Sequence, residues 1–267
     1  MRACPKCGNA DFHAKFVEPP FIIVRCKSCS LVFLGNPPDE DRLYDEYYTN
    51  VEPDPDNYRK DSDDGGLAEL FAINQQRLHH IKKIKGDGRL LDIGCGRGFF
   101  LKSAVGSGFD AHGIDVSQRA IGYATRRLGV SASVRHLADV ASSDRQYDIV
   151  TLWHVLEHFI NPFEMLRAIR SILAPGGICI VEVPNLHSLK FILARQKWEG
   201  GNHPLYHRTF FSAKTLNKAL SDCGYSNVRR EQISYRLPER TAVYNGLKRA
   251  LNFLALDAFL DFTAWKR

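Results

Sequence analysis

An apolar strand pattern that runs directly into three closely spaced glycines constrains the fold of this chain most. Residues 89–93 read Arg-Leu-Leu-Asp-Ile, and Gly94, Gly96 and Gly98 follow at every second position. Glycine adopts backbone conformations that other residues avoid, and it lets a ligand approach the main chain closely. A helix expected over about 98–105 would point free N–H groups and its positive end at that ligand. The pattern therefore predicts a buried strand, a ligand-binding turn and a helix in direct succession.

A carboxylate stands near the end of the next predicted strand, residues 111–116. This residue, Asp115, comes about twenty residues after the glycines. A carboxylate in this place suits the two hydroxyls of a ribose, so we expect a nucleoside-containing cofactor. A dinucleotide is less compatible, because the glycines are not spaced as Gly-x-Gly-x-x-Gly and because Asp92 would repel a pyrophosphate.

Strand and helix patterns alternate from residue 89 onward, which favours parallel βαβ units with ligands at the carboxyl ends of the strands. A further helix and two strands near the end of the sequence would add an antiparallel pair at one edge. The predicted strands are 89–93, 111–116, 132–137, 147–152, 178–183, 227–233 and 260–265. The predicted helices are 67–85, 98–105, Ser117 to Gly129, 161–173, 212–223 and 244–256. Within 67–85, we expect the basic residues, Arg77 among them, to face solvent.

Four of the seven cysteines form two Cys-x-x-Cys pairs in the first 29 residues, with eighteen residues between the pairs. This spacing is typical of a four-thiolate zinc ribbon, in which each tight turn aims two sulfurs at one ion. A disulfide framework would require a secreted protein, of which the sequence has no sign. We therefore predict a Zn²⁺ ribbon over residues 1–34. Its predicted ligands are Cys4, Cys7, Cys26 and Cys29. Three cysteines are expected to be small buried side chains: Cys95, Cys179 and Cys223.

Five motifs between residues 90 and 185 occur in a specific order. They are Leu91-Asp92-Ile93-Gly94-Cys95-Gly96-Arg97-Gly98, Gly113-Ile114-Asp115-Val116-Ser117, Tyr147-Asp148-Ile149-Val150, His154-Val155-Leu156-Glu157-His158 and Leu173-Ala174-Pro175-Gly176-Gly177. This order resembles class I S-adenosylmethionine-dependent methyltransferases, above all the ubiquinone-pathway O-methyltransferases and related small-molecule enzymes. The resemblance implies an α/β, Rossmann-like sheet of seven strands with a reversed last strand, over residues 67–267. It also implies S-adenosylmethionine as the cofactor, held by Asp92, Gly94, Cys95, Gly96, Gly98, Asp115, Val116, Asp139 and Trp153.

The motif His154-Val155-Leu156-Glu157-His158 follows a predicted strand, in the turn where the methyl acceptor lies in this family. Three interpretations stay open. Glu157 pairs locally while one histidine packs in the interior, or His158 is a general base, since histidine titrates near neutral pH. In the third, Glu157 and His158 bind a divalent ion, as a Glu-His pair does in related O-methyltransferases and small-RNA methyltransferases. An inverted zinc-protease motif would need one continuous helix here and is not favoured.

A second group of histidines lies in residues 200–211. His207 resembles the histidine of a Glu-His-x-x-x-Phe-Ser pattern in sugar C-methyltransferases, which also carry a four-cysteine zinc module. Tyr206 stands at the Glu position of that pattern, so the match is incomplete. The resemblance at His207 still makes it a second candidate base. Packing within a loop is the alternative for both His203 and His207.

These patterns predict an enzyme that transfers a methyl group from S-adenosylmethionine to a hydroxyl or carbon of a small molecule, such as a sugar or a quinone-like ring. Its catalytic candidates are Glu157, His158 and His207. An RNA methyltransferase that binds nucleic acid through its ribbon is the alternative, less favoured because the ribbon has few basic residues. A non-catalytic interaction module fits the intact glycine turn poorly.

Residues 35–66 have a linker composition rich in proline and aspartate. Within it, Tyr44, Tyr47 and Tyr48 either cover the cofactor or dock the linker on the domain. No apolar stretch reaches the length of a membrane span, and we expect a cytoplasmic protein.

Overall fold

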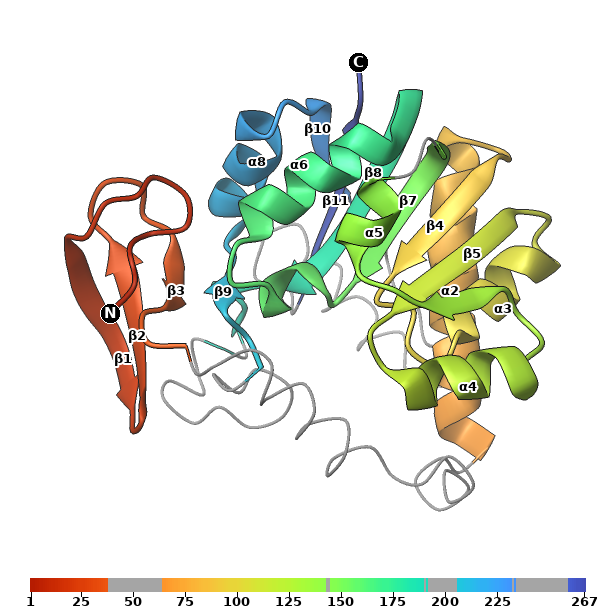
Figure 1. The fold of residues 1–267 in the computed structure, drawn as a ribbon, viewed down its shortest axis with the longest axis horizontal. Coiled ribbons are helices and arrows are strands. Elements are labelled where there is room, and N and C mark those ends of the chain that lie inside the picture. Colours follow the sequence, from red (N-terminus) through yellow and green to blue (C-terminus); the bar gives the residue numbers. More distant parts are fainter. Residues whose placement is uncertain (38–63, 143–144, 190, 192–205, 232, 234–258) are drawn as a thin grey trace.

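Two β-sheets organise the chain in the computed structural model (Figure 1). The structure describes residues 1–37, 64–142, 145–189, 191, 206–231, 233 and 259–267. The predictions for Tyr44, Tyr47 and Tyr48, for His203 and for a helix at 244–256 lie outside these residues. Among the described residues, no helix combines the length and apolarity needed to cross a bilayer.

The larger sheet has seven strands in the order β10-β11-β8-β7-β4-β5-β6. Strands β6, β5, β4, β7 and β8 run parallel, whereas β11 runs antiparallel to both of its neighbours. The predicted seven-stranded α/β sheet with a reversed last strand is therefore confirmed. The strands are β4 (Arg89–Ile93), β5 (Asp110–Asp115), β6 (Ala132–Val134), β7 (Tyr147–Trp153), β8 (Leu173–Pro184), β10 (Ser226–Glu231) and β11 (Phe259–Trp265).

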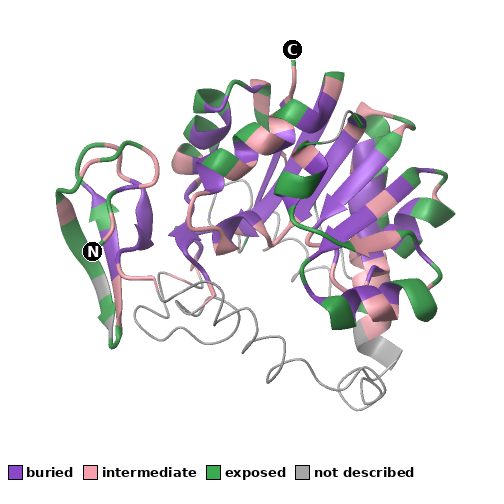
Figure 2. Ribbon diagram, in the orientation of Figure 1, coloured by how far each residue is buried: buried purple, intermediate pink, exposed green. Residues whose placement is uncertain are grey.

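Apolar side chains alternate along the central strands between two cores, one on each face of the sheet. Leu90 and Ile149 belong to one core, and their neighbours Leu91 and Val150 belong to the other. Helices cover both faces, which explains why consecutive positions in these strands are apolar and buried (Figure 2). The first core includes α2 (Asp64–Ile84), α3 (Phe99–Gly106) and α4 (Gln118–Arg126). The second includes α5 (Leu137–Ala141), α6 (Pro162–Ile172) and α8 (Ala213–Asp222).

Side-chain caps start two of these helices where the sequence predicts them. The Ser117 hydroxyl accepts a hydrogen bond from the N–H of Ala120 at 3.1 Å, and Ser212 caps α8 in the same way. Some boundaries differ from the prediction: β8 begins at Leu173, before the expected 178, and the strand expected at 132–137 ends at Val134. The Asp139 carboxylate accepts the His136 N–H at 3.1 Å, and this local bond starts the short helix α5 instead.

The expectation that Arg77 faces solvent is wrong. Its side chain on α2 is 9% exposed and forms an ion pair with Glu182 on β8, which is 1% exposed. Its guanidinium also lies over the ring of Trp153, 4.2 Å from the centroid. Helical periodicity cannot reveal this burial, because the compensating carboxylate is 105 residues away along the chain.

The smaller sheet joins the N-terminal ribbon to a strand from far along the chain. Strands β1 (Phe12–Glu18), β2 (Phe21–Cys26) and β3 (Val32–Leu34) are antiparallel neighbours. The fourth strand, β9 (Thr209–Phe210), pairs antiparallel with β3 and lies between the ribbon and the large sheet (Figure 1). A strand of two residues is too short to leave a periodic signal in the sequence.

Candidate functional site

The four cysteines of the ribbon converge on one point. All four Sγ atoms lie within 4.8 Å of one another. Two pairs are closer: Cys4 and Cys29 at 3.5 Å, and Cys7 and Cys26 at 3.6 Å. Four thiolates bound tetrahedrally at about 2.3 Å from Zn²⁺ would stand about 3.8 Å apart, so this donor set fits the ion.

The two Cys-x-x-Cys turns have the same backbone design. Gly8 donates its N–H to the carbonyl of Cys4 at 2.9 Å, and Ser30 donates to that of Cys26 at 3.0 Å. Both Gly8 and Ser30 have a positive φ, +70° and +64°. Gly8 adopts this conformation without strain, whereas Ser30 adopts it at a cost, which marks the second turn as a constrained feature.

The glycine turn forms at the carboxyl end of β4, as the sequence predicts. Gly94, Gly96 and Gly98 all have positive φ. An added Cβ would lie 2.5 Å from the Val155 side chain at Gly94 but would meet nothing within 4 Å at Gly96. Gly94 is therefore required by packing, while Gly96 leaves open space beside the turn.

Asp92 is buried next to this turn and is 1% exposed. The Thr151 hydroxyl donates to its carboxylate at 2.7 Å across the β4–β7 pair. Burial raises the pKa of Asp92 to about 7, although Thr151 and the charge of Arg77 act in the opposite direction. A cationic group of a ligand would supply the compensation that this buried carboxylate lacks.

Asp115 connects the end of β5 to the glycine turn. Its carboxylate accepts the N–H of Gly96 and the N–H of Ser117, each at 2.9 Å. Burial raises the pKa of Asp115 despite these bonds. Because the two predicted cofactor carboxylates flank one turn, the structure brings together the residues that a nucleoside cofactor would need.

The other predicted cofactor residues differ in setting. Cys95 is buried, whereas the Val116 side chain is exposed to 37% beside Asp115. Trp153 is the last residue of β7, and the centroid of its ring lies 5.1 Å from the ring centroid of Phe100. Asp139 accepts the N–H of His136 at the start of α5, and its contact with the cofactor stays a prediction.

The three catalytic candidates meet at the end of β7. Glu157 and His158 lie in a 3₁₀ turn (η1, Leu156–His158), and His207 approaches from the segment before β9. One potential ligand atom from each lies within 4.8 Å of the other two. The rings of His158 and His207 stand edge to face with centroids 4.9 Å apart.

Glu157 is the most unusual member of this cluster. It is 2% exposed, and neither carboxylate oxygen has a hydrogen-bond partner among the residues that the structure describes. Burial alone would raise the pKa of Glu157, but His154, His158 and His207 hold it below its usual value. A buried carboxylate without hydrogen bonds is costly, so Glu157 depends on the positive charge of neighbouring histidines and has oxygens that can still accept hydrogen bonds from a ligand.

His154 is a site residue to which the sequence patterns assigned no role of its own. It has a φ of +59°, and its Nε2 lies 2.8 Å from Glu182 Oε1. Its Nδ1 faces Glu157 Oε1 at 3.6 Å. Burial would lower the pKa of His154, but these two carboxylates outweigh burial and raise it to about 9. His154 thus joins Glu157 and Glu182 in one network of charges. The sequence signal for this network is Glu182, a charged residue inside an apolar strand pattern.

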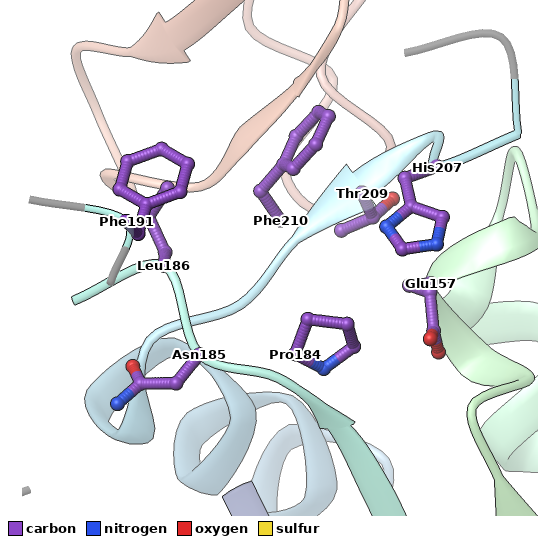
Figure 3. Close-up of a pocket in the computed structure, with 8 residues that line it drawn as sticks. All are labelled: Glu157, Pro184, Asn185, Leu186, Phe191, His207, Thr209 and Phe210. Carbon is purple, nitrogen blue, oxygen red and sulfur yellow. The ribbon is translucent and has the colours of Figure 1, made fainter. Parts of the chain in front are cut away.

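A small pocket opens beside the cluster (Figure 3). Glu157 and His207 are the ionisable residues of its lining, and four of the other six lining residues are apolar. Figure 3 shows the segments after β8 and before β9 on either side of it. The lining residues are Glu157, Pro184, Asn185, Leu186, Phe191, His207, Thr209 and Phe210.

A family model described as a methyltransferase domain matches residues 67–230, more than half of the chain. Among curated proteins, a ubiquinone biosynthesis O-methyltransferase from Bordetella avium is 32% identical over 135 residues, 47% of this chain and 56% of that protein. One from Methylococcus capsulatus is 31% identical over 140 residues, 49% of this chain and 59% of that protein. The match thus spans little more than half the length of these relatives.

Solved structures share the fold. A SAM-dependent methyltransferase from Archaeoglobus fulgidus superimposes with a TM-score of 0.54 and 20% identity, covering 85% of this chain and all of that one. The plantazolicin methyltransferase BpumL in complex with SAH gives 0.55 and 17%, covering 85% and 95%. Since the family model covers more than half of the chain and the fold agrees with it, the chain belongs to the methyltransferase domain family.

Proposed function

We propose that the methyl acceptor is a small molecule with a hydroxyl or an acidic carbon, bound beside Glu157, His158 and His207. The observation that carries this proposal is the convergence of these three side chains beside a small pocket, whose lining includes Glu157 and His207 together with apolar side chains. A sugar or a quinone-like ring combines the necessary polar groups with an apolar face. The named relatives, as O-methyltransferases, support a hydroxyl acceptor.

Bound S-adenosylmethionine supplies an electrophilic methyl group, so the chain has to orient the acceptor and remove its proton. Asp92 and Asp115 would hold the cofactor at the glycine turn. Glu157 would then orient the acceptor, because its two buried oxygens can accept hydrogen bonds from hydroxyl groups.

His158 is the better candidate for the base. Its Nδ1 lies 3.0 Å from the carbonyl oxygen of Tyr206, which only accepts hydrogen bonds. In the neutral ring, Nδ1 therefore carries the proton, and Nε2 keeps a lone pair that can take a proton from the acceptor. This is the tautomer that a general base requires.

The test is production of S-adenosylhomocysteine with a panel of catechols, quinols and nucleotide sugars. With a turned-over acceptor, His158→Gln should lower kcat by about 10²- to 10⁴-fold, the usual contribution of a general base. Calorimetry should give unchanged affinity for S-adenosylmethionine. His79→Gln, on α2 and outside the described site, is the matched control. Undiminished turnover by both His158→Gln and His207→Gln would refute the proposed base.

A divalent cation at Glu157, His158 and His207 is the second candidate. The unpartnered oxygens of Glu157 and the mutual proximity of the three ligands favour it. Native mass spectrometry distinguishes the two alternatives, because a second metal would add to the ribbon ion and would be lost in Glu157→Gln. Calorimetry with Mg²⁺, Mn²⁺ and Zn²⁺ tests the same site. No binding and a single metal per chain would leave His158 as a base alone.

For the ribbon, we propose one Zn²⁺ on its four cysteines in a protein of the cytoplasm, where thiols stay reduced. RNA as an acceptor receives less support. Lys6 pairs with Asp222 at 3.1 Å and Lys27 with Asp11 at 2.7 Å, so neighbouring carboxylates already occupy two of its few cations. Salt-sensitive binding of a transfer RNA would reverse this preference.

A further inference from the structure

The segment that carries His207 lies between the ribbon and the catalytic turn and is bonded to both. On the ribbon side, β9 pairs with β3, and Leu34 donates its N–H to the carbonyl of Arg208 at 2.9 Å. On the catalytic side, Arg208 donates its N–H to the carbonyl of Glu157 at 2.8 Å. The His158–Tyr206 contact adds a further bond between the turn and this segment. Any shift of β3 therefore changes where His207 and the hydrogen-bond partner of His158 lie.

Two of the predicted metal ligands, Cys26 and Cys29, lie on the hairpin that β2 and β3 form. Cys26 is the last residue of β2, and its N–H bonds to the carbonyl of Leu31 at 2.9 Å, just before β3 begins. Alternate residues of the hairpin enter two apolar clusters. Phe33 packs in a large core that also contains Cys4 and Cys26, whereas Val32 packs with Leu186 and Phe210 of the pocket wall.

Arg2, two residues before the first cysteine, ties these parts together. Its guanidinium donates to the carbonyl of Leu34 at 3.0 Å, to that of Ile160 at 2.8 Å and to that of Arg208 at 3.4 Å. It also lies over the ring of Phe33, 5.3 Å from the centroid. One planar side chain thus joins the ribbon strand, the segment after η1 and the residue that follows His207, a task that suits arginine and not lysine.

We infer that Arg2 and strand β3 make the four-cysteine ribbon a structural part of the acceptor site, with Arg2 as a positioning residue for the segment that carries His207. The inference rests on the proposed acceptor site at His158 and His207. The cofactor site is built on β4 and β5, neither of which pairs with a ribbon strand. Disturbing the ribbon should therefore affect the acceptor site and leave cofactor binding intact.

Two readouts other than turnover test this. Hydrogen exchange of the amides of residues 206–211 should accelerate about tenfold or more in Arg2→Met, and in the wild-type protein stripped of metal by a chelator, because the bonds to β3 open. Amides of β4 and β5 should keep their rates. Nitrogen-15 spectra should show His158 changing from the Nδ1-protonated tautomer to a mixture, and His158→Gln assigns the signal.

Arg25→Met is the matched control, since Arg25 is an exposed arginine of the same ribbon. It should leave the exchange rates and the His158 spectrum unchanged. Affinity for S-adenosylmethionine should stay within twofold in all variants. Unchanged hydrogen exchange at residues 206–211 after metal removal would overturn the inference. A large loss of S-adenosylmethionine affinity in Arg2→Met or in the metal-free protein would also overturn it. If exchange and tautomer change while kcat does not, the structural coupling holds and the proposed acceptor site fails.

Discussion

The Thr151 hydroxyl and the Asp92 carboxylate form a 2.7 Å hydrogen bond between adjacent parallel strands, beneath the glycine turn. Thr151 is 0% exposed and Asp92 is 1% exposed, so neither group has water available. The bond therefore satisfies one oxygen of a carboxylate whose pKa burial raises to about 7. The protonation state of Asp92 near neutral pH then depends on the charge that a bound ligand places beside it.

Cofactor affinity should rise as pH increases from 5.5 to 7. Below pH 7 the raised pKa leaves Asp92 largely protonated, and pairing with the cationic amino group of S-adenosylmethionine requires the charged form. Each unit of pH should therefore change affinity by up to about tenfold, with release of a proton on binding. Calorimetry in two buffers of different ionisation enthalpy measures both the affinity and the number of protons released. Asp92→Asn should bind weakly and without this pH dependence; equal pH dependence in the variant would contradict the assignment.

Gly94→Ala should destabilise the protein more than Gly96→Ala. Both positions have positive φ, which costs an alanine about 1–2 kcal/mol. At Gly94 the new methyl would also lie 2.5 Å from Val155, and overpacking adds about 1–3 kcal/mol. Urea unfolding measures the difference. The double variant Gly94→Ala/Val155→Ala should recover part of the overpacking cost, and no recovery would refute the steric explanation.

Removing Arg77 should cost about 3–5 kcal/mol of unfolding free energy, because Glu182 would lose its main compensating charge in the interior. Burial would raise the pKa of Glu182, and Arg77 and His154 instead hold it at about 2. Arg77→Met in urea unfolding is the measurement. Lys85→Met is the control, since Lys85 pairs with Asp148 at 3.6 Å with both side chains partly exposed. That pair should contribute about 0–1 kcal/mol, and equal losses in the two variants would refute the argument.

Cys26→Ser and Cys29→Ser should each lower the zinc content from one ion per chain to almost none, because hydroxyls are poor zinc ligands. Native mass spectrometry counts the ion directly. Cys223→Ser is the control, as Cys223 is buried outside the ribbon. Unaltered metal content in the ribbon variants would show that the four thiols serve another purpose.

Local patterns predicted most of the large sheet. The apolar runs at β4, β7 and β8 signal strands, and Ser117 and Ser212 signal helix starts, since each depends on neighbours a few residues away. The cysteine spacing likewise predicts which side chains converge. In the same way, the motif after β7 indicates Glu157 and His158 as candidate site residues.

Features that depend on distant partners were not predictable. The burial of Arg77 depends on Glu182, and the tautomer of His158 depends on a carbonyl 48 residues away. The pairing of β9 with β3 brings together residues about 180 positions apart, across which no periodicity extends. Backbone strain at His154 is equally hidden, because most histidines have a negative φ and no local pattern shows that this one departs from it.

Strand β11, the last of the described strands along the chain, fills an interior place in the sheet between β8 and β10. While the ribosome is still adding residues 259–265, β8 carries an open edge, and β10 has no neighbour to join. The order of translation thus differs from the order of assembly, and the sheet closes through contacts of long sequence separation, which form slowly. A chain that still lacks residues 259–265 would expose the apolar edge of β8, and such an edge is a site of aggregation.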